Sequence, residues 1–114
     1  EICACLVGSE MCIRDRYNVE VGTFGHAGDG NLHPTFLCDK RDKEEFARVE
    51  AAVDEMFDVA ISLHGTLSGE HGIGTAKSKW MEKETSRGTI LFSQRLRRAL
   101  DPKGLLNPTK LVGI

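Results

Sequence analysis

A glycine-rich turn between two extended segments constrains the fold of this chain most strongly. Tyr17–Gly25 alternates weakly between apolar and polar side chains, and Leu32–Leu37 resumes the extended pattern, as strands do. Between them stands Asp29-Gly30, a pair typical of the two-residue type I′ turn that joins antiparallel strands. The sequence therefore predicts a β-hairpin with these two residues at its tip.

An apolar repeat at three- and four-residue spacing predicts one long helix after the hairpin, over about Lys43–Leu63. Asp42 can cap the start of this helix because a short carboxylate accepts hydrogen bonds from the first free backbone N–H groups. Gly65 is expected to end the helix. His64 then falls at the C-terminal end, where a cation is favourable.

The rest of the chain predicts shorter elements. A second glycine-rich stretch contains at most a short strand over Thr66–Ser68, and two helices are expected over Ala76–Glu84 and Thr89–Leu100. Asp101-Pro102 should end the second of these helices. A hairpin, a long helix, a glycine-rich segment and C-terminal helices together predict an α+β fold.

Size and charge exclude several classes of function. The chain has 114 residues, enough for at most one compact domain, and 15 Lys and Arg stand against 17 Asp and Glu. This balance argues against a nucleic-acid-binding surface, which usually shows a basic excess, and against a polybasic membrane patch. No apolar run approaches the roughly 20 residues of a transmembrane helix.

The first sixteen residues have the marks of a non-native segment. Leu6–Arg16 resembles one translated frame of a transposase-type sequencing adaptor, so residues 1–16 are expected to be adaptor-derived and residues 17–114 to be the native domain. The alternative is a genuine N-terminal strand with a Cys3/Cys5 pair. Without this segment only Cys38 is left, which favours a reduced, cytoplasmic-type interior over a disulfide framework.

Two histidines flank the predicted turn in the stretch GHAGDGNLHP. If Asp29 and Gly30 are the central turn residues, His26 and His33 face one another across the ladder, with Cβ atoms about 4.5–5.5 Å apart. Two imidazoles at that spacing can reach one divalent ion. The alternative is a pair of exposed strand histidines without a ligand.

The second glycine-rich stretch, SGEHGIG, carries a carboxylate beside an imidazole. In an extended segment, adjacent side chains point to opposite sides, so Glu70 and His71 can face a metal and a substrate separately. A carboxylate added to two imidazoles gives a His₂Glu set that leaves coordination positions open, as catalytic sites require. The alternative is an ordinary flexible loop.

These two stretches, followed by DPKGLLNPTK at Asp101–Lys110, resemble the C-terminal part of the FAD-linked oxidase family. This vanillyl-alcohol-oxidase-like group of flavoproteins includes the glycolate oxidase flavin subunit, D-lactate dehydrogenase and D-2-hydroxyglutarate dehydrogenase. The resemblance covers essentially all of residues 17–114. It implies that the α+β fold is an incomplete ferredoxin-like cap domain.

The resemblance also implies a function and a set of site residues. By it, His26, His33 and Glu70 hold a divalent metal, often zinc, with iron and manganese left open by the donor set. His71 is implied as the catalytic base that takes the hydroxyl proton of a D-2-hydroxy acid of the glycolate or D-lactate type. FAD is the implied acceptor of the α-hydrogen, which gives the 2-oxo acid.

Weaker candidates follow from the same resemblance. Asn31 is implied to support the turn or the substrate, and Asn107 and Lys110 to contact the flavin through a C-terminal tail. Members of the family usually carry glycine where this chain has Thr109, so the path of that tail is expected to differ.

The resemblance implies further partners. They are an FAD-binding domain on the N-terminal side of residue 17 and electron-transfer subunits, in a cytoplasmic protein or one held peripherally at the inner face of the membrane. We expect the 114-residue chain alone neither to bind FAD tightly nor to oxidise substrate. Two alternatives compete with the flavoenzyme: a stand-alone metal-binding module or small metallohydrolase that uses the same three ligands, and a purely structural domain whose histidines bind nothing.

Overall fold

The computed structural model describes residues 2–110, and for residues 2–7 and residue 27 it describes the backbone alone. The described chain forms two compact units that meet at Gly65 and Thr66. The first unit contains helix α1 (Ile2–Tyr17), strands β1 (Glu20–His26) and β2 (Asn31–Leu37) and helix α2 (Lys43–Ser62). The second contains short helices η2 (Ser78–Trp80) and α3 (Met81–Glu84) and helix α4 (Arg87–Leu100). The fold is α+β, as predicted.

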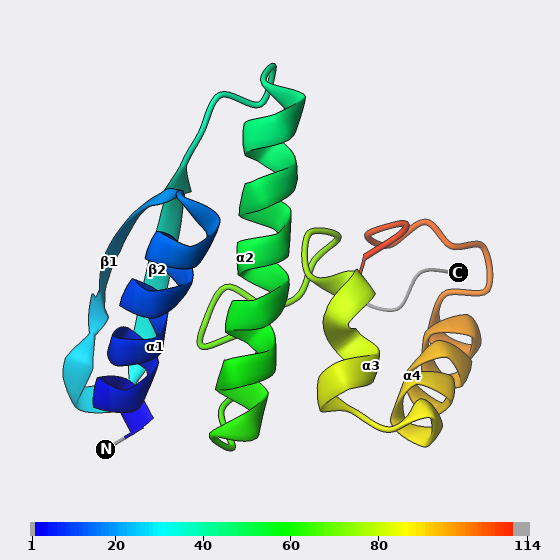
Figure 1. Cartoon of the computed structure of the whole chain (residues 1–114). Helices are drawn as coiled ribbons and strands as arrows, with labels where there is room; N and C mark the ends of the chain where they lie inside the picture. The colour runs from blue at the N-terminus through cyan, green and yellow to red at the C-terminus, as the bar shows by residue number, and fades with distance from the viewer. Residues whose placement is uncertain (1, 111–114) are drawn as a thin grey trace. The chain divides into compact units, whose positions relative to one another are not determined.

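The predicted hairpin is present as the antiparallel pair β1–β2, but its tip differs from the prediction (Figure 1). Four residues, Ala27–Gly30, connect the strands through a short 3-10 turn, and Gly30 takes a left-handed φ of 68°. The prediction of a two-residue turn at Asp29-Gly30 is therefore wrong. His33 is opposite Phe24 instead of opposite His26. Because the shift is by an even number of residues, each side chain keeps its expected face.

Gly25 explains why the strands close in this register. A Cβ atom at this position would lie 2.1 Å from the carbonyl oxygen of Asn31, far inside van der Waals contact. Glycine alone therefore lets the two backbones approach here. After this close approach the chain enters the four-residue connection Ala27–Gly30.

Helices α1 and α2 pack against each other and over one face of the hairpin. Their shared core consists of buried apolar residues, namely Ile13, Val19, Val49, Ala52 and Met56. Phe36 packs against this core from β2, and the Thr23 hydroxyl of β1 donates a hydrogen bond to the buried Glu10.

Residues 2–17 are helical, so the alternative of an N-terminal strand is wrong. The side chains of Cys3 and Cys5 lie outside the described ones. The boundary of the native domain at residue 17 stays a prediction. Ile13, which lies inside the adaptor-like segment, is 2% exposed and belongs to the core that α1 and α2 share.

The ends of α2 confirm one prediction and correct another. Asp42 caps the N-terminus, where its carboxylate accepts from the N–H groups of Glu44 and Glu45 at 3.0 Å each. At the C-terminus His64, with a φ of 61°, takes the left-handed position. The N–H of Gly65 then bonds to the Ala60 carbonyl at 2.8 Å, which completes a Schellman motif. The left-handed residue at the end of α2 is therefore His64, and Gly65 is the residue after it.

The second unit has little regular structure before α4. Thr66–Ser68 does not form the short strand that was considered, and the helix expected over Ala76–Glu84 is reduced to η2 and α3. Helix α4 begins after Ser86, whose hydroxyl accepts from the Thr89 N–H at 3.1 Å, and ends at Asp101 as expected.

The tail after α4 is fixed by two charged side chains. The Asp101 carboxylate accepts from the N–H groups of Leu105 and Leu106, at 3.0 and 2.7 Å. The Arg97 guanidinium donates to main-chain carbonyls further along, including that of Lys110 at 2.8 Å. These bonds replace the secondary structure that the tail lacks as far as residue 110.

Among residues 2–110, no helix combines the length and the apolar character that crossing a membrane requires.

Candidate functional site

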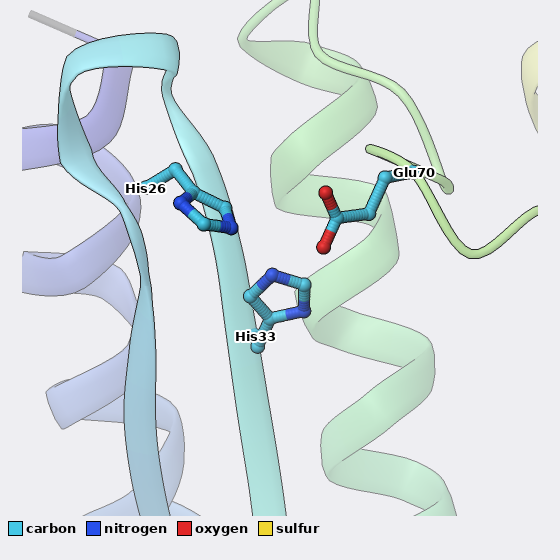
Figure 2. A group of neighbouring side chains, drawn as sticks. All are labelled: His26, His33 and Glu70. Atoms are coloured by element: carbon cyan, nitrogen blue, oxygen red, sulfur yellow. The ribbon is translucent and has the colours of Figure 1, made fainter.

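The hairpin presents its two histidines on the face that the helices leave uncovered. Phe36 and Thr23 point toward α1 and α2, whereas His33 and His26 lie at the alternate positions of their strands. Figure 2 shows the two imidazoles beside each other on the hairpin. Their ring centroids are 5.9 Å apart and their planes are nearly perpendicular. The predicted pairing of two imidazoles on one face is therefore present, although they lie diagonally across the ladder.

Phe24 supports this arrangement. Its ring stacks on that of His33 with 5.5 Å between centroids and 18° between planes, as expected for directly opposed residues. Phe24 is nevertheless 65% exposed.

Glu70 and His71 lie in a bend of the second unit. Their side chains are 47% and 72% exposed, and the Nε2 atom of His71 is 3.5 Å from the Oε1 atom of Glu70. The prediction that the two side chains point to opposite sides is wrong, because that alternation belongs to extended backbone. Gly72 and Gly74 follow with left-handed φ values of 75° and 55°, which carry the chain out of the bend. A carboxylate and an imidazole thus lie next to each other in this segment.

The weaker candidates lie at two places. Asn31 is the register partner of His26, so the two share the uncovered face of the hairpin. Asn107 and Lys110 belong to the tail of the second unit, where the Lys110 N–H donates to the Asn107 carbonyl at 3.3 Å. Thr109 between them has a φ of 65°, a conformation that favours glycine.

Comparison with known proteins gives a consistent family. The profile of "FAD linked oxidases, C-terminal domain" matches residues 10–111. The chain is 46% identical over 99 residues to "Glycolate oxidase subunit GlcD" of Bacillus subtilis, which covers 87% of this chain and 21% of that protein. It is 39% identical over 87 residues to "D-lactate dehydrogenase [cytochrome], mitochondrial" of Arabidopsis thaliana, covering 76% of this chain and 15% of that protein.

A third relative is named for another 2-hydroxy acid. "D-2-hydroxyglutarate dehydrogenase" of Stutzerimonas stutzeri is 37% identical over 94 residues, with 81% of this chain and 20% of that protein covered. The chain thus spans about a fifth of the length of the curated relatives that it matches. The family profile matches most of the chain, including the hairpin histidines and the Glu70–His71 bend. The chain therefore belongs to the family of FAD linked oxidases, and it corresponds to their C-terminal domain.

Proposed function

We propose that the protein to which this domain belongs is an FAD-dependent oxidoreductase that oxidises a D-2-hydroxy acid, of the glycolate or D-lactate type, to the 2-oxo acid. The family match supports the flavin, and three relatives named for glycolate, D-lactate and D-2-hydroxyglutarate support the substrate class. The same match favours this function over a stand-alone metallohydrolase, because none of these relatives is named for hydrolysis.

We further propose that His26, His33 and Glu70 hold a divalent cation. Each side chain offers one ligand atom: the hairpin supplies two imidazole nitrogens on one face, and the Glu70–His71 bend supplies a carboxylate oxygen, a set that can bind one ion (Figure 2). The observation that carries this proposal is the pair of imidazoles on the uncovered face of the hairpin. The two imidazoles do not serve to fill the core, since the core lies on the other face of the hairpin.

The donor set suits the proposed chemistry. Two imidazole nitrogens and one carboxylate oxygen fit zinc, iron or manganese, and they leave positions for substrate oxygens. When bound, such an ion supplies Lewis-acid polarisation of the hydroxyl and carboxylate, while the flavin supplies the redox step. Neutral imidazoles are required for coordination, so binding is expected to weaken under acid conditions.

His71 is the proposed general base. Imidazole is the side chain that most often accepts a proton in catalysis, and that of His71 is 72% exposed, so a substrate hydroxyl can reach it. The Nε2 atom of His71 is 3.5 Å from the carboxylate of Glu70, so the proposed base lies next to the proposed ligand. Asn31, on the hairpin face, is proposed to support the turn or the substrate.

Cobalt(II) titration of the 114-residue chain tests the metal ligands, because the visible absorption of the ion reports its coordination. We expect His26→Ala, His33→Ala and Glu70→Gln each to weaken binding by about 100-fold or more, since loss of a direct ligand exceeds the 10–100-fold typical of a supporting residue. His64→Ala and Glu82→Gln are matched controls that change the same residue types at exposed positions. Equal binding by all five variants and the wild type would overturn the ligand assignment.

Oxidation is tested separately on the full-length protein. With glycolate, D-lactate or D-2-hydroxyglutarate and no oxygen, the flavin absorption should bleach with at least one of them, and L-lactate is the stereochemical control. His71→Ala should slow the bleaching by about 100-fold or more, the range that general bases contribute. A flavin that none of the D-acids reduces would contradict the proposed reaction.

A further inference from the structure

The segment that carries Glu70 and His71 starts from one fixed residue, Leu67. This side chain is 3% exposed, in a stretch without helix or strand. Both main-chain polar groups of Leu67 are nevertheless bonded, and both partners are charged side chains. The Glu84 Oε2 atom accepts from its N–H at 2.9 Å, and the Lys77 Nζ atom donates to its carbonyl at 2.8 Å.

Glu84 makes a second bond to the same short stretch. Its Oε1 atom accepts from the Thr66 hydroxyl at 2.5 Å, so one carboxylate spans two consecutive residues. Glu84 is the last residue of α3, and Lys77 directly precedes η2. Two charges of opposite sign, 10 and 17 residues along the chain from Leu67, thus converge on it. We call Lys77, Glu84 and their bonds to Thr66 and Leu67 the Leu67 clamp.

The Leu67 clamp supplies the main-chain hydrogen-bond partners that a neighbouring strand supplies in a sheet. Buried main-chain groups need partners, and here no strand supplies them. Hydrogen bonds with a charged partner are about twice as strong as neutral ones, so two such bonds can hold a single residue. Keeping Lys77 there has a cost, because its partial burial lowers the pKa of the ammonium.

Beyond Leu67 the chain forms neither helix nor strand before Ser78. Ser68 and Gly69 lead to Glu70, three residues and at most about 10 Å of chain away. Gly72 and Gly74 follow in left-handed conformations with open space around them. Leu67 is the buried, bonded residue from which the chain leads to Glu70, so its position affects the direction in which Glu70 leaves the unit.

We propose that Lys77 and Glu84 are positioning residues, which hold Leu67 so that Glu70 and His71 are presented in the geometry that the metal and the substrate require. This rests on the proposed function of Glu70 as a metal ligand. Supporting contacts behind direct ligands commonly change metal affinity by about 10–100-fold. Neither Lys77 nor Glu84 contacts the metal itself in this proposal.

Cobalt(II) titration of the 114-residue chain also tests the clamp, with the visible spectrum and the thermal midpoint recorded for every variant. Glu84→Ala removes both acceptors, and Lys77→Met removes the ammonium but keeps an apolar stem. Each should weaken cobalt binding about tenfold and change the visible bands. Glu84→Gln keeps an acceptor for the Leu67 N–H, and Lys77→Arg keeps a donor, so both should recover most of the affinity.

Two matched controls separate the clamp from general effects of lost charge. Glu82→Ala removes a carboxylate two residues earlier on α3, and Lys103→Met removes an exposed ammonium; both should bind cobalt like the wild type. Wild-type affinity and an unchanged spectrum in Glu84→Ala and Lys77→Met, together with a lower thermal midpoint, would make the clamp purely structural and overturn this inference alone. If the wild type and His26→Ala bind cobalt equally, the proposed metal site falls, and the inference falls with it.

Discussion

The hairpin and the Glu70–His71 bend hold their candidate side chains by different means. His26 and His33 lie on a two-stranded ladder of seven residue pairs. The other face of this ladder packs on a core of buried apolar side chains. Glu70 and His71 stand in a segment without ladder or helix, which begins at a residue fixed by two charged side chains. One pair is held by backbone geometry, and the other by side-chain chemistry.

This difference has a functional consequence. A hairpin with a packed face keeps two imidazoles at a constant separation, which suits ligands that must be in place before an ion arrives. A glycine-rich bend without ladder or helix depends for its position on individual contacts, including the two charged side chains at Leu67. The hairpin should therefore resist small changes in side chains and fail only when its register fails. The bend should be sensitive to changes at its anchor.

The largest effect on stability should come from Gly25→Ala, which disrupts the hairpin and leaves the Glu70–His71 bend unchanged. The new Cβ would lie 2.1 Å from the Asn31 carbonyl oxygen, so the register must change, at a cost of at least about 3 kcal/mol. The matched control is Gly22→Ala on the same strand, where no atom lies within 4 Å and the change should stay within about 1 kcal/mol. Urea unfolding measures both. Equal stability of the two variants would mean that Gly25 does not set the register.

A smaller effect is expected in the bend. Gly72→Ala and Gly74→Ala each place a Cβ in left-handed backbone with open space around it, so the cost should be about 1–2 kcal/mol of local strain. We expect cobalt affinity to fall several-fold and the thermal midpoint to fall by no more than the several degrees that this strain amounts to. Gly28→Ala, at a position also free of neighbouring atoms but without a left-handed φ, serves as the control. A large loss of overall stability in either bend variant would contradict the local character of the segment.

The end of α2 offers a gain in stability that leaves the bend untouched. His64 holds a left-handed φ of 61°, which is unfavourable for any residue with a Cβ. His64→Gly should therefore raise the free energy of unfolding by about 0.5–1 kcal/mol, measured by urea unfolding, with unchanged cobalt affinity. Lower stability in this variant would show that the His64 side chain makes a stabilising contact.

The smallest effect concerns the tail and depends on pH. Backbone N–H groups of Leu106 and Leu105 hold the pKa of Asp101 below its usual value. This group therefore contributes stability above the unfolded pKa of about 3.9, and the contribution is lost as the pH falls through the lower, folded value. The protection factor of the Leu106 amide, which is the exchange rate of an unstructured peptide divided by the observed rate, should fall below about pH 4 in the wild type. It should be lower at neutral pH in Asp101→Asn, which keeps only one acceptor oxygen. An exchange profile that is the same in both would contradict this role.

The sequence predicted the elements that depend on local pattern. The extended segments, the long helix with its Asp42 cap and the amphipathic C-terminal helix are all present, because each follows from residues within one or two turns of chain. The turn and the end of α2 were predicted less well. At the hairpin tip the connection has four residues instead of two, although Gly30 takes the left-handed φ as expected. At the end of α2 the left-handed residue is His64 instead of the expected Gly65.

The sequence predicted which residues make up the candidate site, but not the contacts that hold them in place. The spacing of histidines around a glycine-rich turn indicated two imidazoles on one face, and an error of two residues in register did not change that face. Lys77 and Glu84 left no signal in the sequence, since each resembles an ordinary surface charge and their target, Leu67, lies 10 or 17 residues away. The electron-transfer subunits, the cytoplasmic location and the flavin contacts of Asn107 and Lys110 stay predictions.

Metal analysis of the purified 114-residue chain after dialysis against zinc tests the central claim most directly, because it asks only whether His26, His33 and Glu70 act as one ligand set. We predict close to one zinc per wild-type chain and less than about a tenth in the double variant His26→Ala, His33→Ala, since three protein ligands are needed for a stable site. Less than about half an equivalent in the wild type, unchanged in His26→Ala and in Glu70→Ala, would contradict the account.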